Sequence, residues 1–499
     1  MVASSPWLNV LSIHDFWVSI SKTAPVLAAA TPAESSSIVL ASVLLSLVII
    51  YFASKLGGEI CARINLPPVL GELVAGVLVG VSALHLLVFP GGGTDVSSSL
   101  MMQLVQMDAH LSSEGLTAVF QSQSEVISVL AEIGVVILLF EIGLESDLKE
   151  LIRVGPQAAI VAVVGVVTPF TLGTVGLMLL FKVAAIPAIF AGAALTATSI
   201  GITARVLAEI QQLASKEGQI IIGAAVLDDV LGIIVLAVVA GLAKTGEVQV
   251  GNVVFLVVSA VVFLVGSIWL GRLLSPFFVI LVNELRTRGQ LLITALIFAF
   301  LLSYVAAVIQ LEAILGAFAA GLILAETEKR KELEVQVKPI ADMLVPIFFV
   351  VVGARTDVSV LNPFVPENRE GLIMAAFLVV VAIVGKVITG FTLVGQSPLN
   401  RWAIGIGMIP RGEVGLVFAA IGASSGVLSD SLQAAIVVMV ILTTFVAPPL
   451  LRVAFSNQAA QTALSEEAAI LNASALVDAV DDGLVTETTL LEDKQTANE

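Results

Sequence analysis

The chain has 499 residues, of which 58% are hydrophobic and only 12% are charged, and its mean hydropathy is +1.06. Soluble globular proteins carry about 25% charged residues, so this composition excludes a soluble protein and predicts a polytopic membrane protein. Much of the formal net charge of −16 comes from an acidic C-terminal segment. No basic patch with interleaved aromatic residues indicates nucleic-acid binding, and the single cysteine excludes an internal disulfide.

Thirteen hydrophobic segments follow one another along the chain. A transmembrane helix needs about 20 apolar residues, and a β-barrel would instead show short segments of alternating hydrophobicity. We therefore expect an all-α bundle of thirteen transmembrane helices. The segments lie near residues 36–56, 66–88, 124–145, 156–181, 184–207, 218–242, 251–271, 290–309, 311–326, 338–353, 371–395, 401–424 and 431–453.

The charges between the segments predict how the bundle is oriented. Most loop lysines and arginines, Lys149 and Arg330 among them, fall on one side of the predicted bundle. Positively charged loops stay in the cytoplasm, so the N-terminus is expected outside and the C-terminus inside, as an odd number of spans requires. The sequence thus divides into an extracytoplasmic segment at 1–35, a transmembrane unit at 36–455 and an acidic cytoplasmic tail at 456–499, which we expect to be disordered.

Two segments contain stretches that a continuous membrane helix rarely holds. The fifth contains LTATSIGITARV at 195–206, and the twelfth contains IGIGMIPRGEVGLV at 404–417, with Pro410. They occupy equivalent positions in two inverted six-helix repeats that would flank the seventh segment. Paired broken helices of this kind are typical of transporter binding sites, where unwound backbone lines a cavity. For either stretch alone, close helix packing through small residues is the alternative.

Two adjacent aspartates, Asp228 and Asp229, interrupt the apolar run AAVLDDVLGIIVLAVVAGL at 224–242. An ionised carboxylate at a bilayer centre costs about 3 kcal/mol or more, so a buried pair indicates function. Neighbours on a helix point about 100° apart. One aspartate is therefore expected to face an ion cavity and the other to contact a protein partner. Lys386, the only lysine deep within a predicted span, is the candidate partner.

The other charges in or near the spans favour structural roles. Arg411 and Glu413, in the PRGEV stretch, are expected to neutralise each other or the ends of the broken helix rather than to bind the ion. Single carboxylates near span ends are expected to be interfacial or structurally paired. These are Glu72, Glu132, Glu141 and Glu312.

Asp229, Thr198 and Ser199 together offer the oxygen ligands that a small monovalent cation prefers. They predict a site for transported Na+, with Li+ and K+ as alternatives, and the same carboxylate can accept protons. Competition of cation and protons for one carboxylate, with alternating exposure to the two sides, constitutes antiport. No cofactor, resident metal or enzymatic activity is expected, because the sequence has no metal-ligand spacing and no phosphate-binding loop.

An intramembrane aspartyl protease is the remote alternative, because it also uses two buried aspartates. Its carboxylates must lie about 3 Å apart and share a proton, whereas adjacent residues on one helix splay apart. A channel is also disfavoured, because its filter would normally repeat around a symmetric axis.

The stretches LPPVLGELVAGVLVG, FEIGLESDL, ATSIGIT, VLDDVLG and GMIPRGEVGL, together with Lys386, resemble the monovalent cation:proton antiporter superfamily. Within it, they are most similar to bacterial sodium/proton antiporters with a paired-aspartate motif. The resemblance covers about residues 36–455. It implies thirteen helices, a homodimer, and elevator-type motion of a core domain against a dimerisation domain.

By the same resemblance, Asp229 is the principal carboxylate for cation and protons, and Asp228 is the partner of Lys386. Thr198 and Ser199 lie in the family's unwound helix beside the ion. The paired aspartates imply electrogenic exchange with a role in pH homeostasis, in the plasma or thylakoid membrane of a photosynthetic bacterium. A potassium/proton antiporter is the alternative function, although the soluble nucleotide-binding domain usual in the glutathione-gated potassium branch does not follow the last segment.

Overall fold

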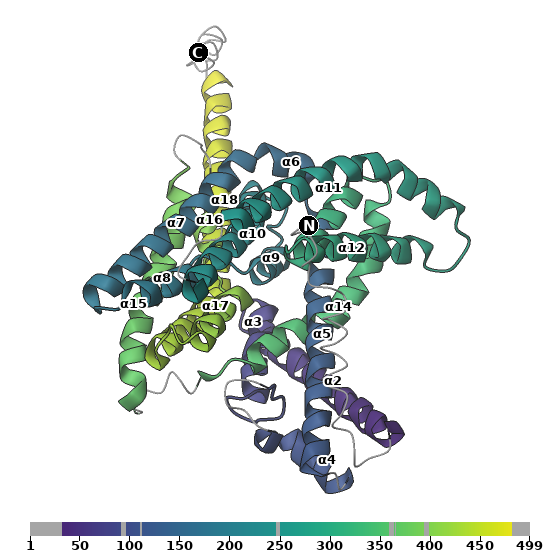
Figure 1. Cartoon of the computed structure of the whole chain (residues 1–499). Coiled ribbons are helices and arrows are strands. Elements are labelled where there is room, and N and C mark those ends of the chain that lie inside the picture. The colour runs from purple at the N-terminus through teal and green to yellow at the C-terminus, as the bar shows by residue number, and fades with distance from the viewer. Residues whose placement is uncertain are drawn as a thin grey trace, which may run out of the picture.

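The computed structural model describes residues 32–90, 96–109, 112–245, 250–358, 364, 366–393 and 399–481, and all regular structure in these ranges is helical (Figure 1). The elements are α2 (Pro32–Arg63), α3 (Pro68–Val79), the 3-10 turn η2 (Val96–Ser98), α4 (Leu100–Ala109), α5 (Ser113–Glu145), α6 (Leu148–Arg153), α7 (Gly155–Leu180), α8 (Ala185–Ala194), α9 (Ile200–Glu209), α10 (Lys216–Thr245), α11 (Val250–Glu284), α12 (Gln290–Val308), α13 (Ala313–Ala325), α14 (Arg330–Ala354), α15 (Pro366–Phe391), α16 (Arg401–Gly407), α17 (Glu413–Ser424) and α18 (Asp430–Asp481).

Within the described residues, eight helices are long and apolar enough to cross a bilayer. The chain is therefore an all-helical, multi-pass membrane protein. These eight spans are Ser36–Arg63, Ser113–Glu145, Gly155–Leu180, Lys216–Val239, Gln290–Val308, Arg330–Ala354, Arg369–Phe391 and Asp430–Ser456. Four shorter apolar helices accompany them, at Pro68–Val79, Ala185–Ala194, Gly251–Ser267 and Ala313–Ala325.

The helices pack into two groups, which lie on opposite sides of Figure 1. In the first group, α5 contacts both α13 and α14, α2 and α14 contact α3, and α12 packs on α13. In the second group, α7 contacts α8, α10 and α15, while α18 contacts α15, α16 and α17. The second group has a hydrophobic core of its own, with Phe190, Leu378 and Met439 buried in it. The half-helix α9 touches both groups, because it contacts α3 and α5 as well as α10 and α18.

Local sequence signals explain several helix boundaries. Ser112 caps α5, because its hydroxyl accepts a hydrogen bond of 3.1 Å from the amide of Gly115. Asp147 caps α6 in the same way through the amide of Lys149, at 2.8 Å. Proline begins α3, at a position where the missing N–H removes no helical hydrogen bond.

The two stretches that the sequence marks as interruptions are breaks between half-helices. The segment at 184–207 divides into α8 and α9, and the segment at 401–424 divides into α16 and α17. The last helix differs from the expected layout, since α18 continues through the 455 boundary as far as Asp481. The first part of the acidic segment, predicted to be disordered, is thus helical. Residues 482–499 lie outside the described ranges, as do residues 1–31 of the expected N-terminal segment.

Candidate functional site

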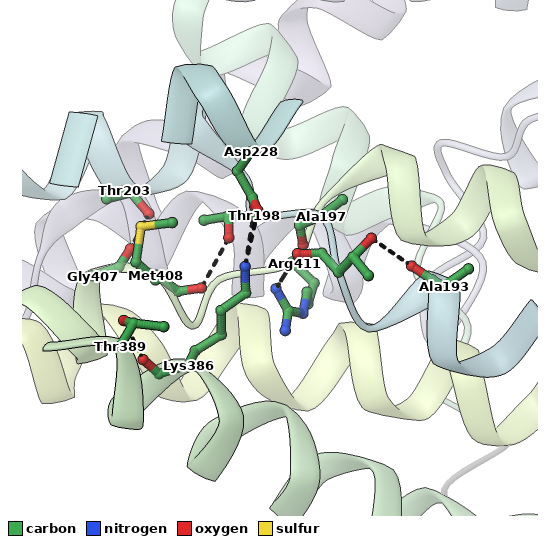
Figure 2. Close-up of polar contacts among 11 residues, drawn as sticks. Ala193, Ala197, Thr198, Thr203, Asp228, Lys386, Thr389, Gly407, Met408 and Arg411 are labelled. Carbon is green, nitrogen blue, oxygen red and sulfur yellow. Dashed lines mark hydrogen bonds and ion pairs between the residues drawn. The ribbon is translucent and has the colours of Figure 1, made fainter. Parts of the chain in front are cut away.

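The two helix breaks are joined to each other by hydrogen bonds. The Ser199 amide donates to the Pro410 carbonyl at 2.8 Å. The Thr203 hydroxyl donates to the Gly407 carbonyl at 2.9 Å, at the C-terminal end of α16 (Figure 2). Helix ends leave carbonyl groups without intrahelical partners, and such groups are costly at membrane depth unless protein satisfies them. Each break therefore supplies the partners that the other lacks.

Arg411, in the second break, places a guanidinium group against the first break. Its side chain is fully buried, and Nη1 donates to the Ala197 carbonyl at 2.7 Å and to that of Thr196 at 3.4 Å. The C-terminal end of α8 carries partial negative charge, which this cation offsets. Its contacts are with backbone carbonyls, in line with a structural role. The side chain of Glu413, expected to share that role, lies outside the described residues.

Asp228 and Lys386 form an ion pair between α10 and α15. Nζ of Lys386 lies 3.1 Å from Oδ2 and 3.3 Å from Oδ1 of Asp228, and both side chains have an exposed fraction of 0% (Figure 2). Gly165 on α7 leaves room for the ammonium, because a Cβ atom there would lie only 3.2 Å from Nζ. Neither charge meets solvent, so each depends on the other to offset its desolvation.

Asp229 lies on another side of α10, at a small cavity beside the crossing breaks. The cavity volume is about 10 Å³, which is the space that one water-sized occupant needs. Carboxylate and hydroxyl oxygens are the polar side-chain groups around it. Its lining residues are Ala197, Thr198, Ser199, Ile200, Asp229, Glu312, Ile314, Gly412 and Val414.

The two hydroxyl groups of the first break belong to residues that line this cavity. The Thr198 hydroxyl donates its proton to the Met408 carbonyl at 3.1 Å (Figure 2), so the lone pairs of its oxygen remain available. Ser199 precedes α9 at the N-cap position without making a side-chain cap. Gly412 permits its approach, because a Cβ there would lie 2.8 Å from the Ser199 Oγ. The three candidate ligands predicted from sequence, Asp229, Thr198 and Ser199, thus surround one cavity.

Glu312 is the cavity residue whose position the sequence did not predict. It was expected to be interfacial or structurally paired, but it lines the cavity with Asp229. It stands 83 positions from Asp229 in the chain and directly before an apolar helix, where the pattern alone suggests an ordinary helix start. The one available signal was a carboxylate next to a thirteen-residue helix too short for a simple span.

These elements make a site that can hold one small cation or protons. Two acidic residues and two hydroxyl-bearing residues line the cavity, and half-helix ends meet beside it. The fixed positive charges, Lys386 and Arg411, are engaged with Asp228 and with carbonyl groups. Acidic and hydroxyl-bearing residues thus line the cavity, while both nearby cations have partners outside its lining or in the backbone of the first break.

Comparisons with known proteins place this chain in a family. The model of the transmembrane sodium/hydrogen exchanger family matches residues 38–456. The high-affinity Na+/H+ antiporter NhaS3 of Synechocystis sp. is 71% identical over 435 residues, covering 87% of this chain and 94% of that protein. The Na+/H+-K+ antiporter GerN of Bacillus cereus is 32% identical over 412 residues, covering 82% and 95%.

Solved structures show a similar fold. A structure of the sodium proton antiporter MjNhaP1 from Methanocaldococcus jannaschii aligns with a TM-score of 0.55 and 16% identity. The alignment covers 84% of this chain and 96% of that one. At 16% identity, this similarity is evidence for a shared fold alone.

Proposed function

This chain belongs to the transmembrane sodium/hydrogen exchanger family, and from that membership we propose that it is a secondary active antiporter exchanging Na+ for H+. The observation that carries the proposal is the cavity at the crossing breaks, which Asp229, Thr198 and Ser199 line together. A buried carboxylate beside unwound backbone supplies the ligands of Na+ and a proton acceptor at one place. The relatives are transporters by name, which favours transport over proteolysis.

Exchange follows from competition for one carboxylate. Asp229 holds either Na+, with the oxygens of Thr198 and Ser199, or protons. In either state the buried charge is compensated, whereas the empty ionised carboxylate is costly to bury. The site therefore changes sides only when loaded, which couples the inward movement of one ion to the outward movement of the other.

Asp228 and Lys386 serve this cycle as a buried ion pair on another side of α10. Cation binding at Asp229 changes the charge near Lys386, so the pair is a second place at which protons can be released or taken up. A second proton-carrying group makes the exchange electrogenic. Arg411 keeps the crossing breaks together by compensating the carbonyls of Thr196 and Ala197.

The helix groups support an elevator arrangement. If the thirteen segments are spans, the first three and the eighth to tenth fall in the group of α2, α3, α5, α12, α13 and α14, and the other two triplets fall in the second group. Such a division is what two inverted six-helix repeats produce. The second group then moves as the core within the unit at 36–455, with the first group as a dimerisation domain, an extracytoplasmic N-terminus and a cytoplasmic C-terminus.

A potassium/proton antiporter is the second candidate. The relative from Bacillus cereus is named for K+ as well as Na+, and carboxylate and hydroxyl oxygens accept either ion. The cavity volume of about 10 Å³ suits a water-sized occupant, which describes either ion, so the transport measurement distinguishes them.

Proton movement in proteoliposomes tests the function. With an imposed pH gradient, Na+, Li+ and K+ are added in turn to wild type, to Asp229→Asn and to the exposed-residue control Glu114→Gln. We expect Na+ to dissipate the gradient in wild type and in the control only. If only K+ dissipates the pH gradient, the transported cation is K+ rather than Na+. If no cation dissipates it, antiport is refuted.

A further inference from the structure

We propose that Glu312 is a second cation-binding carboxylate of this cavity and that its charge sets the affinity for Na+. The inference rests on the proposed function and adds a ligand to the same site. Glu312 and Asp229 both line the cavity with Ser199, and they come from different parts of the molecule.

Glu312 approaches the cavity from the first helix group, in the turn between α12 and α13. Its helix, α13, packs against α5 and α12. Asp229 stands on α10, which packs against α7 in the second group. A cation in the cavity therefore lies between two carboxylates, one from each helix group, and each lowers the free energy of the bound ion.

The turn that carries Glu312 is held firmly. Gln310 ends α12 in the left-handed region, with φ of 66°, and its amide donates to the Ala307 carbonyl at 3.0 Å. The next amide, of Leu311, donates to the Ala306 carbonyl at 2.9 Å. These are the bonds of a helix C-terminus closed by one left-handed residue. They fix the backbone immediately before Glu312, so its position at the cavity is built into the fold.

Helix capping does not account for Glu312. It occupies the N-cap position of α13, with extended backbone, but its side chain makes no cap hydrogen bond to the helix amides. Carboxylates at N-caps are favoured because they satisfy those amides. Here the residue is half-buried at the cavity instead.

Transport kinetics of three variants test this role. Glu312→Gln removes the charge and keeps the shape, and Glu312→Asp keeps the charge on a shorter side chain. The matched control Glu326→Gln removes one exposed carboxylate at the opposite end of α13. Sodium-dependent proton movement is measured in proteoliposomes at several Na+ concentrations, which separates the apparent KM for Na+ from the maximal rate.

We expect Glu312→Gln to raise the apparent KM about tenfold and to retain the maximal rate, with Glu312→Asp intermediate and Glu326→Gln unchanged. An unchanged KM in Glu312→Gln would overturn the inference. If the KM is unchanged and both Glu312 variants lose maximal rate equally, Glu312 is a structural residue.

A binding measurement separates this inference from antiport itself. Sodium is expected to raise the Tm of detergent-solubilised wild type, because a ligand bound by the folded state alone stabilises it. Glu312→Gln should need about tenfold more Na+ for the same shift. If wild type moves no protons but is stabilised by Na+, and Glu312→Gln needs more Na+ for the same shift, antiport fails while the Glu312 ligand stands. If Glu312→Gln responds to Na+ as wild type does, the ligand fails whether or not wild type transports.

Discussion

Two neighbouring carboxylates of α10 stand in different surroundings. Asp228 is fully buried and held by Lys386 at 3.1 Å, so its charge is compensated by a residue of the protein. Asp229, 5% exposed, lines a cavity with the hydroxyl groups of the first break and with Glu312. The hundred-degree rotation between adjacent helix positions separates the two environments.

These two environments explain how a membrane protein can keep two acids side by side. The charge of Asp228 is compensated by Lys386, a residue of the protein that joins α10 to α15. The charge of Asp229 is proposed to receive a mobile partner, either a cation or a proton. Four substitutions test this contrast, and the loss of the Asp229 charge is expected to have the strongest effect.

Replacing Asp229 by asparagine removes the exchangeable charge and should abolish transport. We expect Na+-driven proton movement to fall to the level of empty liposomes, while the protein keeps its fold because the Asp228–Lys386 pair is intact. Proteoliposome flux and the thermal unfolding curve check the two halves of this prediction. Appreciable sodium exchange by this variant would mean that another group carries the ion.

Replacing Lys386 by methionine should destabilise the protein by about 3–5 kcal/mol, because it leaves a buried carboxylate without its cation. The double variant Lys386→Met/Asp228→Asn removes both charges and should recover most of that loss. Thermal unfolding in detergent is measured for wild type, for Lys386→Met, for Asp228→Asn and for the double variant, which completes a double-mutant cycle. If the double variant is no more stable than the single one, the ion pair is not what supports this side of α10.

Replacing Gly412 by alanine should crowd the crossing of the two breaks. The added Cβ would lie 2.8 Å from the Ser199 Oγ, and overpacking of this kind costs about 1–3 kcal/mol. We expect a lower Tm and a higher apparent KM for Na+, because Ser199 must shift. Gly251→Ala is the matched control, since a Cβ there meets nothing within 4 Å. Equal behaviour of the two variants would contradict the close approach at Gly412.

Replacing Thr198 by valine should have the smallest effect of the four. It removes the hydrogen bond to the Met408 carbonyl, at a cost of about 1 kcal/mol, and one oxygen of the cavity. A severalfold rise in the apparent KM for Na+ is expected, with recovery in Thr198→Ser, which restores the hydroxyl. Should the serine variant behave like the valine variant, the methyl group rather than the hydroxyl matters at this position.

The sequence alone determined the class of the protein and the location of its unusual helices. Long apolar runs must become helices in a bilayer, because the backbone has no other partner there. The stretches LTATSIGITARV and IGIGMIPRGEVGLV indicated the interruptions, since Thr, Ser, Gly and Pro weaken a continuous helix. The adjacent aspartates and one deep lysine marked the charged centre, because charges at that depth are too costly to be incidental.

The geometry of the distant contacts comes from the tertiary structure. It sets Lys386 at 3.1 Å from Asp228, the partner that the family resemblance implied, across 158 positions of sequence. It also brings the Arg411 guanidinium to the carbonyls of the other break. Such contacts depend on helix packing and rotation, which local patterns do not encode.

The structure also assigned Glu312 to the cavity, where the sequence suggested an ordinary carboxylate at a span end. Its position depends on how the turn between α12 and α13 meets the crossing breaks. The sequence thus determined that charges are buried in a helical membrane protein, because burial of charge is a local energetic anomaly. The fold determined which carboxylate faces a protein cation and which faces a cavity, because that choice belongs to the arrangement of several helices.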